Sequence, residues 1–171
     1  MAGSGKTTLL QMINGLERPD QGELEVLGRP VPYENLESYR RGIGYAVQGA
    51  GLFPHLTAEQ NVTLVAKLVG WSEAKRRSRF LDLLKTVDLE EDVASRLPRQ
   101  LSGGQQQRLG ICRALMLQPT ILLLDEPFAG VDPIAVEDIQ QMIISLKQQN
   151  IGVLITDHNV RETLSITDRS Y

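Results

Sequence analysis

Cysteine is almost absent from this sequence, because Cys112 is the only one among 171 residues. A single cysteine excludes an internal disulfide and any metal site built from several cysteines, and it fits a reducing compartment. Long hydrophobic runs are absent too, since no stretch approaches the roughly 18–20 apolar residues that span a bilayer. The sequence also shows no signal peptide. If the protein works at a membrane, we expect other chains to cross it.

An excess of positive charge is also lacking. Lysine and arginine total 18 residues against 21 aspartates and glutamates, which gives a net charge of −3. This balance gives no electrostatic reason to expect nucleic-acid binding. Aromatic residues make up 5% of the sequence, and one tryptophan, four tyrosines and three phenylalanines do not form a stacking platform for bases. We therefore expect no nucleic-acid partner.

Apolar strands alternate with amphipathic helices along the chain. The stretches 43–47, 121–124 and 151–156 read as strands. The second is a run of four aliphatic residues, which is typical of a buried parallel sheet. Strands separated by helices predict an α/β fold with a mostly parallel sheet. The predicted parts of this single domain are a core of residues 1–54 and 118–171 and a helical insertion of residues 55–117.

Three of the predicted helices begin with recognisable caps. Thr57 is followed by Gln60, and Ser102 by Gln105, at the spacing of a capping box. Asp132 stands before a proline, which is favoured at the first helical position. These local signals predict helix starts at all three places.

Two weaker patterns lie near the start of the chain. The first predicts a helix over residues 6–15 with Leu9, Leu10 and Ile13 on one face. The second predicts a strand over residues 23–27 between two turns.

A glycine-rich segment stands directly before the first predicted helix. Its backbone N–H groups can converge on phosphate oxygens, because glycine permits close approach and the helix offers its positive end. Lys6 would neutralise the β- and γ-phosphates of a nucleotide, and the Thr7 hydroxyl would ligate Mg²⁺. The match to G-x-x-x-x-G-K-[ST] is partial, since the first glycine would lie before Met1; a simple glycine-rich turn is the alternative. The predicted phosphate-binding residues are Gly3, Ser4, Gly5, Lys6, Thr7 and Thr8.

Two adjacent carboxylates end the aliphatic strand at 121–124. Burying a carboxylate costs free energy unless it has partners, so a position there suggests a function. Asp125 suits the ligand shell of Mg²⁺, and Glu126 suits a general base that polarises an attacking water. The alternative is that one carboxylate merely caps a helix.

Gln48 and His158 also end predicted strands. Gln48 could contact Mg²⁺ or the attacking water, and its loop could relay the nucleotide state to a partner. A lone histidine is usually structural or exposed, but His158 would stand at the mouth of a parallel sheet beside the suspected phosphate site, which makes it a candidate contact of the γ-phosphate. His55 has no such context and is read as a loop residue.

A second glycine-rich helix start separates this sequence from simpler nucleotide-binding proteins. The helical insertion lies between it and the first phosphate loop, so one nucleotide can hardly be held by both within one chain. Two chains placed head to tail would let each helix start face the partner's γ-phosphate. The predicted nucleotide-contacting residues of this segment are Ser102, Gly103, Gly104 and Gln105.

Taken together and in this order, the motifs resemble the ATP-binding subunits of ABC transporters. The correspondence covers nearly the whole sequence: a phosphate loop, Q-loop Gln48, signature 101–105, a Walker B strand with Asp125 and Glu126, a D-loop ending at Asp132, and switch His158. The resemblance implies a P-loop NTPase fold and an ATPase that uses ATP and Mg²⁺. It implies a head-to-tail homodimer, or a dimer with a paralogous ATPase, at the cytoplasmic face of the membrane on transmembrane permease subunits.

The finer resemblance divides the sequence. Residues 1–118 are similar to ATPases of glycine betaine and osmoprotectant importers, whereas 125–164 are similar to the lipopolysaccharide-export ATPase. This division suggests a recombinant, designed or chimeric chain, and a natural divergent member is the alternative. Because partners of this family dock on the helical insertion and the Q-loop, the front half favours osmoprotectant import over lipopolysaccharide export.

The family pattern also has strands before the phosphate loop and after residue 171 that this sequence does not contain. A truncated or chimeric chain with little turnover is therefore a further alternative. The competing class is a DNA-maintenance or translation-factor ATPase. Such proteins need long coiled-coil insertions or basic surfaces, and this sequence has neither.

Overall fold

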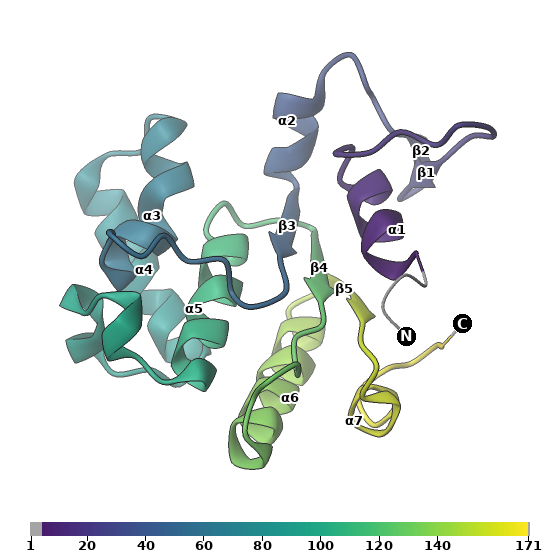
Figure 1. The fold of residues 1–171 in the computed structure, drawn as a ribbon. Coiled ribbons are helices and arrows are strands. Elements are labelled where there is room, and N and C mark those ends of the chain that lie inside the picture. Colours follow the sequence, from purple (N-terminus) through teal and green to yellow (C-terminus); the bar gives the residue numbers. More distant parts are fainter. Residues whose placement is uncertain (1–4, 171) are drawn as a thin grey trace.

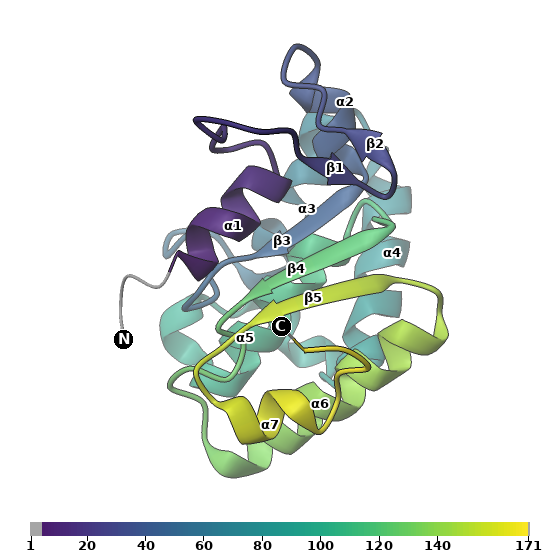
Figure 2. The same ribbon diagram turned by 90° about the vertical axis from the view of Figure 1, so that its right-hand side faces the viewer.

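A parallel sheet lies at the centre of the molecule in the computed structural model, which describes residues 5–170. The strands are β3 (Ile43–Ala46), β4 (Ile121–Asp125) and β5 (Gly152–Thr156), in the order β3–β4–β5 (Figures 1 and 2). Both pairings are parallel, so the carboxyl ends of the strands meet at one edge. The predicted α/β fold with a parallel sheet is confirmed.

The middle strand is buried on both faces. Leu122, Leu123 and Leu124 are fully buried, and successive side chains of a strand point to opposite faces. Leu122 and Leu124 join the main apolar cluster with helices α5 (Gly103–Leu115) and α6 (Pro133–Gln148). The other face is covered by α1, as Figure 1 shows with the sheet seen near its edge. This two-sided burial explains the unbroken aliphatic run.

Helices α3 (Ala58–Leu68) and α4 (Glu73–Thr86) lie beside α5, away from the sheet (Figure 1). Val62, Phe80 and Ile111 are fully buried in the apolar cluster that these helices share with the core. Two short 3₁₀ helices, η1 (Glu91–Ser95) and η2 (Pro98–Gln100), lead from α4 to α5.

Helix α5 also packs directly on the sheet. A Cβ atom placed on Gly44 of β3 would lie 2.6 Å from the carbonyl oxygen of Ala114, so only glycine fits this approach. Cys112, near the same end of α5, is fully buried, and its burial raises the pKa of the thiol to about 12. Helix α5 therefore joins the helical group to the core, while the division into a core and a helical subdomain stays a prediction.

All three predicted caps are confirmed. Thr57 and Ser102 each accept a hydrogen bond from the backbone N–H three residues on, and Gln60 and Gln105 complete the two capping boxes. Asp132 accepts from two backbone N–H groups at the start of α6. These features depend on neighbouring residues only, which is why the sequence predicts them.

The weaker local predictions are only partly right. Helix α1 (Lys6–Ile13) ends before residue 15. Of its three predicted core-facing residues Leu10 is buried, whereas Leu9 is 49% exposed. The strand expected over 23–27 is reduced to two residues. This strand, β1 (Glu25–Val26), pairs antiparallel with β2 (Arg29–Pro30). Two further short helices are α2 (Leu36–Arg41) and α7 (Val160–Leu164). None of the described helices is long and apolar enough to cross a membrane.

Asn61 should be the polar residue whose loss costs the most stability in the helical group. It is fully buried, its amide oxygen accepts from Phe53 N at 2.7 Å, and its NH₂ group lies within hydrogen-bond distance of three carbonyls in residues 53–57. We expect Asn61→Ala to lower the free energy of unfolding by about 2 kcal/mol, because these backbone groups lose their partner. Urea denaturation measures the change.

Asn35 is the matched control, because it is exposed and its side chain makes no capping bond. Asn35→Ala should change the free energy of unfolding by less than about 0.5 kcal/mol. Equal losses in the two variants would contradict the assigned role of Asn61.

Candidate functional site

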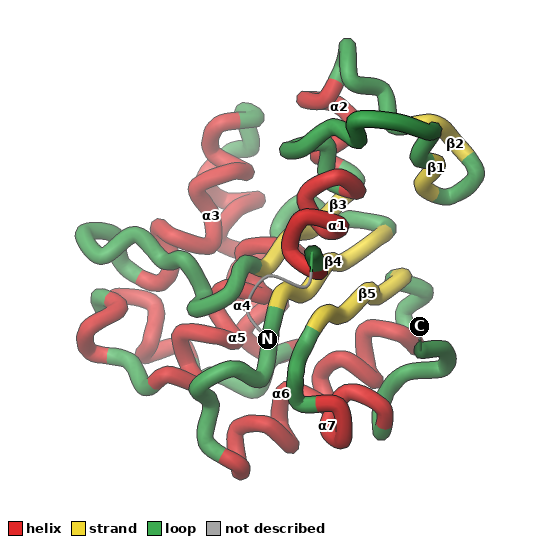
Figure 3. The backbone as a smooth tube through the Cα atoms, turned by 45° about the vertical axis from the view of Figure 1, so that its right-hand side comes forward, coloured by secondary structure: helices red, strands yellow, loops and turns green. Residues whose placement is uncertain are grey.

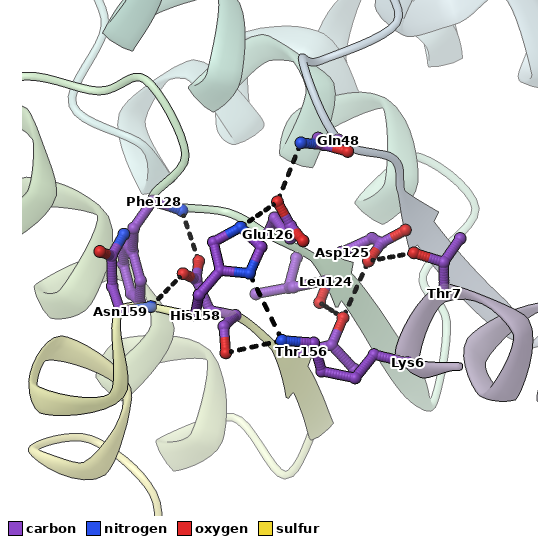
Figure 4. Close-up of polar contacts among 11 residues, drawn as sticks. Lys6, Thr7, Gln48, Leu124, Asp125, Glu126, Phe128, Thr156, His158 and Asn159 are labelled. Carbon is purple, nitrogen blue, oxygen red and sulfur yellow. Dashed lines mark hydrogen bonds and ion pairs between the residues drawn. The ribbon is translucent and has the colours of Figure 1, made fainter. Parts of the chain in front are cut away.

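The first turn of α1 brings two polar side chains to the carboxyl edge of the sheet. Gly5 stands before the helix with φ at 75°, a left-handed conformation that glycine adopts without strain. Lys6 and Thr7 follow at once, and both side chains reach residues at the ends of β4 and β5 (Figure 4). The predicted phosphate-loop residues Gly3 and Ser4 lie outside the described residues; Thr8 is exposed on α1.

Asp125 ends β4 and is 3% exposed. Its Oδ1 accepts from the Thr156 hydroxyl at 2.9 Å and from the Thr7 hydroxyl at 3.2 Å, and its Oδ2 accepts from the Tyr45 hydroxyl at 3.4 Å. Burial, and then the charge of Asp125, raises the pKa of Tyr45 to about 12, so that this hydroxyl stays protonated. Three donors thus hold the carboxylate in one orientation.

Glu126 turns away from Asp125 because its backbone is left-handed. Its φ is 52°, which costs a residue with a side chain about 1 kcal/mol, and its N–H donates to Thr156 O at 2.6 Å. The carboxylate is 12% exposed. One oxygen, Oε2, lies 2.9 Å from Gln48 Nε2 and 2.9 Å from His158 Nε2 (Figure 4).

The contacts of His158 indicate where its ring carries a proton. Nδ1 lies 3.4 Å from the ammonium of Lys6, which can only donate. Nδ1 therefore accepts, and the neutral ring carries its hydrogen on Nε2, where it donates to Glu126. Lys6 also donates to the carbonyl of Asp157 at 3.3 Å. One polar chain thus runs from Lys6 through His158 and Glu126 to Gln48.

Sequence reasoning missed three residues that support this group. Tyr45 and Thr156 hold Asp125, as described above. Asp157 accepts from the backbone N–H of Phe128 at 3.0 Å and of Asn159 at 2.8 Å, and so links the loops after β4 and β5. The bond to Asn159 is a local turn that an aspartate predicts. The other contacts join distant segments and depend on the register of the sheet.

The second glycine-rich helix start is not part of this group. Ser102 and Gln105 bond to each other, and in the described part of the chain their hydrogen bonds do not reach Lys6, Asp125 or Glu126. A Cβ on Gly104 would lie 2.9 Å from Cβ of Ala135 in α6, so this helix start packs closely against α6, the helix that Asp132 caps. Figure 3 shows the starts of α5 and α6 on the same side of the molecule.

The donors that meet at the edge of the sheet fit a magnesium ion. Mg²⁺ prefers oxygen ligands, and it usually keeps one or two protein ligands together with water and substrate phosphates. The Thr7 hydroxyl and the Asp125 carboxylate are such a pair, 3.2 Å apart. Within residues 5–170, no three histidine, cysteine or carboxylate side chains gather as a metal site.

The comparisons with known proteins agree with this arrangement. A family model described as ABC transporter matches residues 1–129. The chain is 41% identical over 169 residues to the glycine betaine/carnitine/choline transport ATP-binding protein OpuCA of Bacillus subtilis, a match that covers 98% of this chain and 44% of OpuCA. It is 42% identical over 173 residues to the lipopolysaccharide export system ATP-binding protein LptB of Haemophilus influenzae, covering 99% of this chain and 70% of LptB.

A solved structure is similar as well. The dimeric ATP-binding cassette MJ0796, in a post-hydrolysis state bound to ADP and Pi, superposes with a TM-score of 0.84 at 36% identity. The superposition covers 95% of this chain and 73% of that one. The chain spans less than half the length of OpuCA. Both kinds of relative match nearly the whole chain at similar identity, so neither match is confined to the front or the back.

Thr156 should stabilise the fold through its bond to Asp125. We expect Thr156→Val to lower the free energy of unfolding by about 1–2 kcal/mol, because a buried carboxylate loses a donor. Thermal or urea unfolding at neutral pH measures the change.

Thr63 provides the matched control. It is 9% exposed, like Thr156, but its hydroxyl donates to a carbonyl of its own helix. Thr63→Val should cost less than about 1 kcal/mol, since no charged group loses a partner. A cost for Thr156→Val no larger than that of the control would show that the hydroxyl does not support Asp125.

Proposed function

The chain belongs to the ABC transporter family, and on that premise we propose that it binds ATP with Mg²⁺ and hydrolyses it to power a membrane transporter. The convergence of Gln48 and His158 on one oxygen of Glu126 carries the proposal. This carboxylate stands at the end of the sheet beside Lys6 and the Mg²⁺-type donors. A general base needs such a place, next to the phosphates that it acts on.

The proposed reaction assigns one task to each group. Lys6 and the N–H groups at the start of α1 would hold the phosphates, and Thr7 with Asp125 would hold Mg²⁺, which would supply positive charge to neutralise the phosphates. A water molecule attacks the γ-phosphorus as the bond to the β–γ bridging oxygen breaks. Glu126 takes the proton of that water, and Gln48 lies close enough to orient it.

His158 would act at the γ-phosphate. In the structure it donates to Glu126 and accepts from Lys6. When Lys6 turns to the phosphates, the Nε2–H of His158 can turn from Glu126 to a γ-phosphate oxygen, which accepts the hydrogen bond. Its exposed fraction, 51% for the side chain, leaves room for this contact.

The signature segment is assigned to the site of a second chain. Ser102 and Gly103 are exposed, Gly104 is buried, and the hydrogen bonds of Ser102 stay within this helix start in the described part of the chain. A head-to-tail homodimer, or a dimer with a paralogous ATPase, would place this start and the D-loop residue Asp132 at the partner's γ-phosphate. The relative MJ0796 is a dimer in its solved structure.

The transported substrate is assigned from the relatives. We favour import of an osmoprotectant, because the front of the sequence resembles such importers and OpuCA is named for glycine betaine, carnitine and choline. A lipopolysaccharide-export type of ATPase is the alternative, which the match to LptB supports. In either case the partners would be transmembrane permease subunits, and the chain would lie at the cytoplasmic face of the membrane.

Glu126→Gln should stop hydrolysis and spare ATP binding. The amide keeps the size of the side chain but cannot take a proton, so phosphate release should fall by about 100-fold or more. ATP-bound dimers should then accumulate, which light scattering after size-exclusion chromatography detects.

The exposed Glu34 provides the control, because Glu34→Gln makes the same change away from the site. Its phosphate release should equal that of the unaltered protein. Unchanged turnover in Glu126→Gln would remove Glu126 from the role of base. Absence of turnover in the unaltered protein would favour the truncated or chimeric alternative.

Ser102→Glu should prevent the dimer without weakening nucleotide binding by the single chain. We expect this change, added to Glu126→Gln, to abolish the ATP-dependent dimer, because a carboxylate would face the partner's γ-phosphate. The affinity of the monomer for a fluorescent ATP analogue should stay within about threefold, since Ser102 acts on the partner's nucleotide.

Ser72 offers a matched control, since it also caps a helix through its hydroxyl. Ser72→Glu should leave the ATP-dependent dimer intact. If Ser102→Glu lowered the affinity of the monomer as strongly as it lowered dimer formation, the segment would serve its own chain and the head-to-tail arrangement would be wrong.

A further inference from the structure

The loop that follows Gln48 adopts an unfavourable backbone. Gly49, Ala50 and Gly51 have φ values of 73°, 61° and 54°, all left-handed. Ala50 has a side chain and is only 3% exposed, so its conformation costs about 1 kcal/mol that a neighbouring structure must offset. The compact turn includes a hydrogen bond from Gly51 N to Gly49 O at 2.7 Å.

The neighbouring structure is helix α5. Arg113 donates from Nη1 to the carbonyl of Gly51 at 2.7 Å and from Nη2 to the carbonyl of Ala50 at 2.8 Å. Burial lowers the pKa of this guanidinium, but an arginine remains charged near neutral pH. Two charged donors on successive carbonyls form a fixed fork, which is stronger than a pair of neutral hydrogen bonds.

A second contact, one turn earlier in α5, supports the fork. A Cβ atom on Gly110 would lie 3.1 Å from both Cα and O of Ala50. Glycine at this position therefore lets the backbone of the loop lie against the helix. The loop is held at two points of α5, and neither contact involves the group around Glu126.

The residue just before this loop, Gln48, contacts Glu126. Gln48 donates to Glu126 Oε2 at 2.9 Å, and it stands only two residues before the first clamped carbonyl. Helix α5 begins with Gly103, the glycine that follows its cap Ser102, and Arg113 lies about 15 Å further along the helix. One rigid element thus connects the signature segment to the residue that touches the candidate base.

We propose that Arg113 is a positioning residue that fixes Gln48 against Glu126 by clamping the loop after Gln48, residues 49–51, to α5. It acts through Gln48 and does not touch the reacting atoms. A shift of α5, whose start is assigned above to the partner's nucleotide, would pass through Arg113 to Gln48. This inference rests on the proposed function for its effect on turnover, whereas the clamp itself is independent of hydrolysis.

The first experiment measures the clamp without nucleotide. Hydrogen exchange of the backbone amides in residues 49–53 should be faster in Arg113→Met by about tenfold or more, because the loop loses both donors. In Arg113→Lys the increase should be smaller, since the ammonium can reach one carbonyl. This conservative variant also serves if Arg113→Met fails to fold.

Arg79→Met is the matched control for this measurement. Arg79 is a half-buried arginine of α4 whose pKa is also lowered by burial, and it donates to the carbonyl of Leu115 at 3.0 Å. Its loss should leave exchange in residues 49–53 unchanged. Equal exchange in the Arg113 variants and the unaltered protein would overturn the clamp, whatever the outcome of any ATPase assay.

The second experiment tests the coupling to turnover by a double-mutant cycle. Gln48→Ala and Arg113→Met should each lower kcat by about tenfold and change KM for ATP by less than about twofold. Because Arg113 acts through Gln48, the double variant should be no slower than Gln48→Ala alone. Arg113→Lys should recover part of the loss.

Two results would distinguish a failure of the proposed positioning role from a failure of the proposed ATPase function. Fully additive losses, as expected for Gln48→Ala combined with Arg79→Met, would show that Arg113 stabilises the fold without positioning Gln48. A protein without any turnover would contradict the proposed function, and the exchange experiment would still decide whether Arg113 clamps the loop.

Discussion

The register between β4 and β5 is the constraint on which the candidate site depends. It sets Asp125 opposite Thr156, so that the threonine hydroxyl reaches the carboxylate and the threonine carbonyl accepts from the N–H of Glu126. A shift of one residue would turn every side chain of β5 to the other face and remove both contacts. The three buried leucines of β4 suit this register, because in it they lie opposite Val153, Leu154 and Ile155 of β5.

Two adjacent carboxylates face different partners because their backbones differ. Asp125 ends the strand in extended conformation and faces the donors from α1 and β5. Glu126 adopts φ at 52°, and this reversal sends its side chain towards Gln48 and His158. Local strain of this kind persists only where surrounding contacts hold it, here the bond to Thr156 O. The side chains of two consecutive residues therefore reach different parts of the candidate site.

The sequence predicted those features that depend on near neighbours. The caps at Thr57, Ser102 and Asp132 were predicted because the partners are at most three residues away, and β4 because a buried strand has few alternatives. The place of His158 beside the candidate phosphate site followed from the rule that parallel strands end at one edge, whereas the sequence did not predict that Gln48 and His158 both contact Glu126. The left-handed Glu126 and the link through Asp157 could not be predicted, since both require the exact alignment of strands about thirty residues apart.

The buried thiol of Cys112 has a practical consequence for studies of motion. Thiol reagents attack the thiolate, and a pKa of about 12 together with full burial leaves almost none of it accessible at neutral pH. Spectroscopic labels could therefore be attached at a single introduced surface cysteine while the native residue is retained. Replacement of Cys112, which lies near the carboxyl end of α5 against the carbonyl of Leu83, would disturb the very helix whose movement such labels would follow.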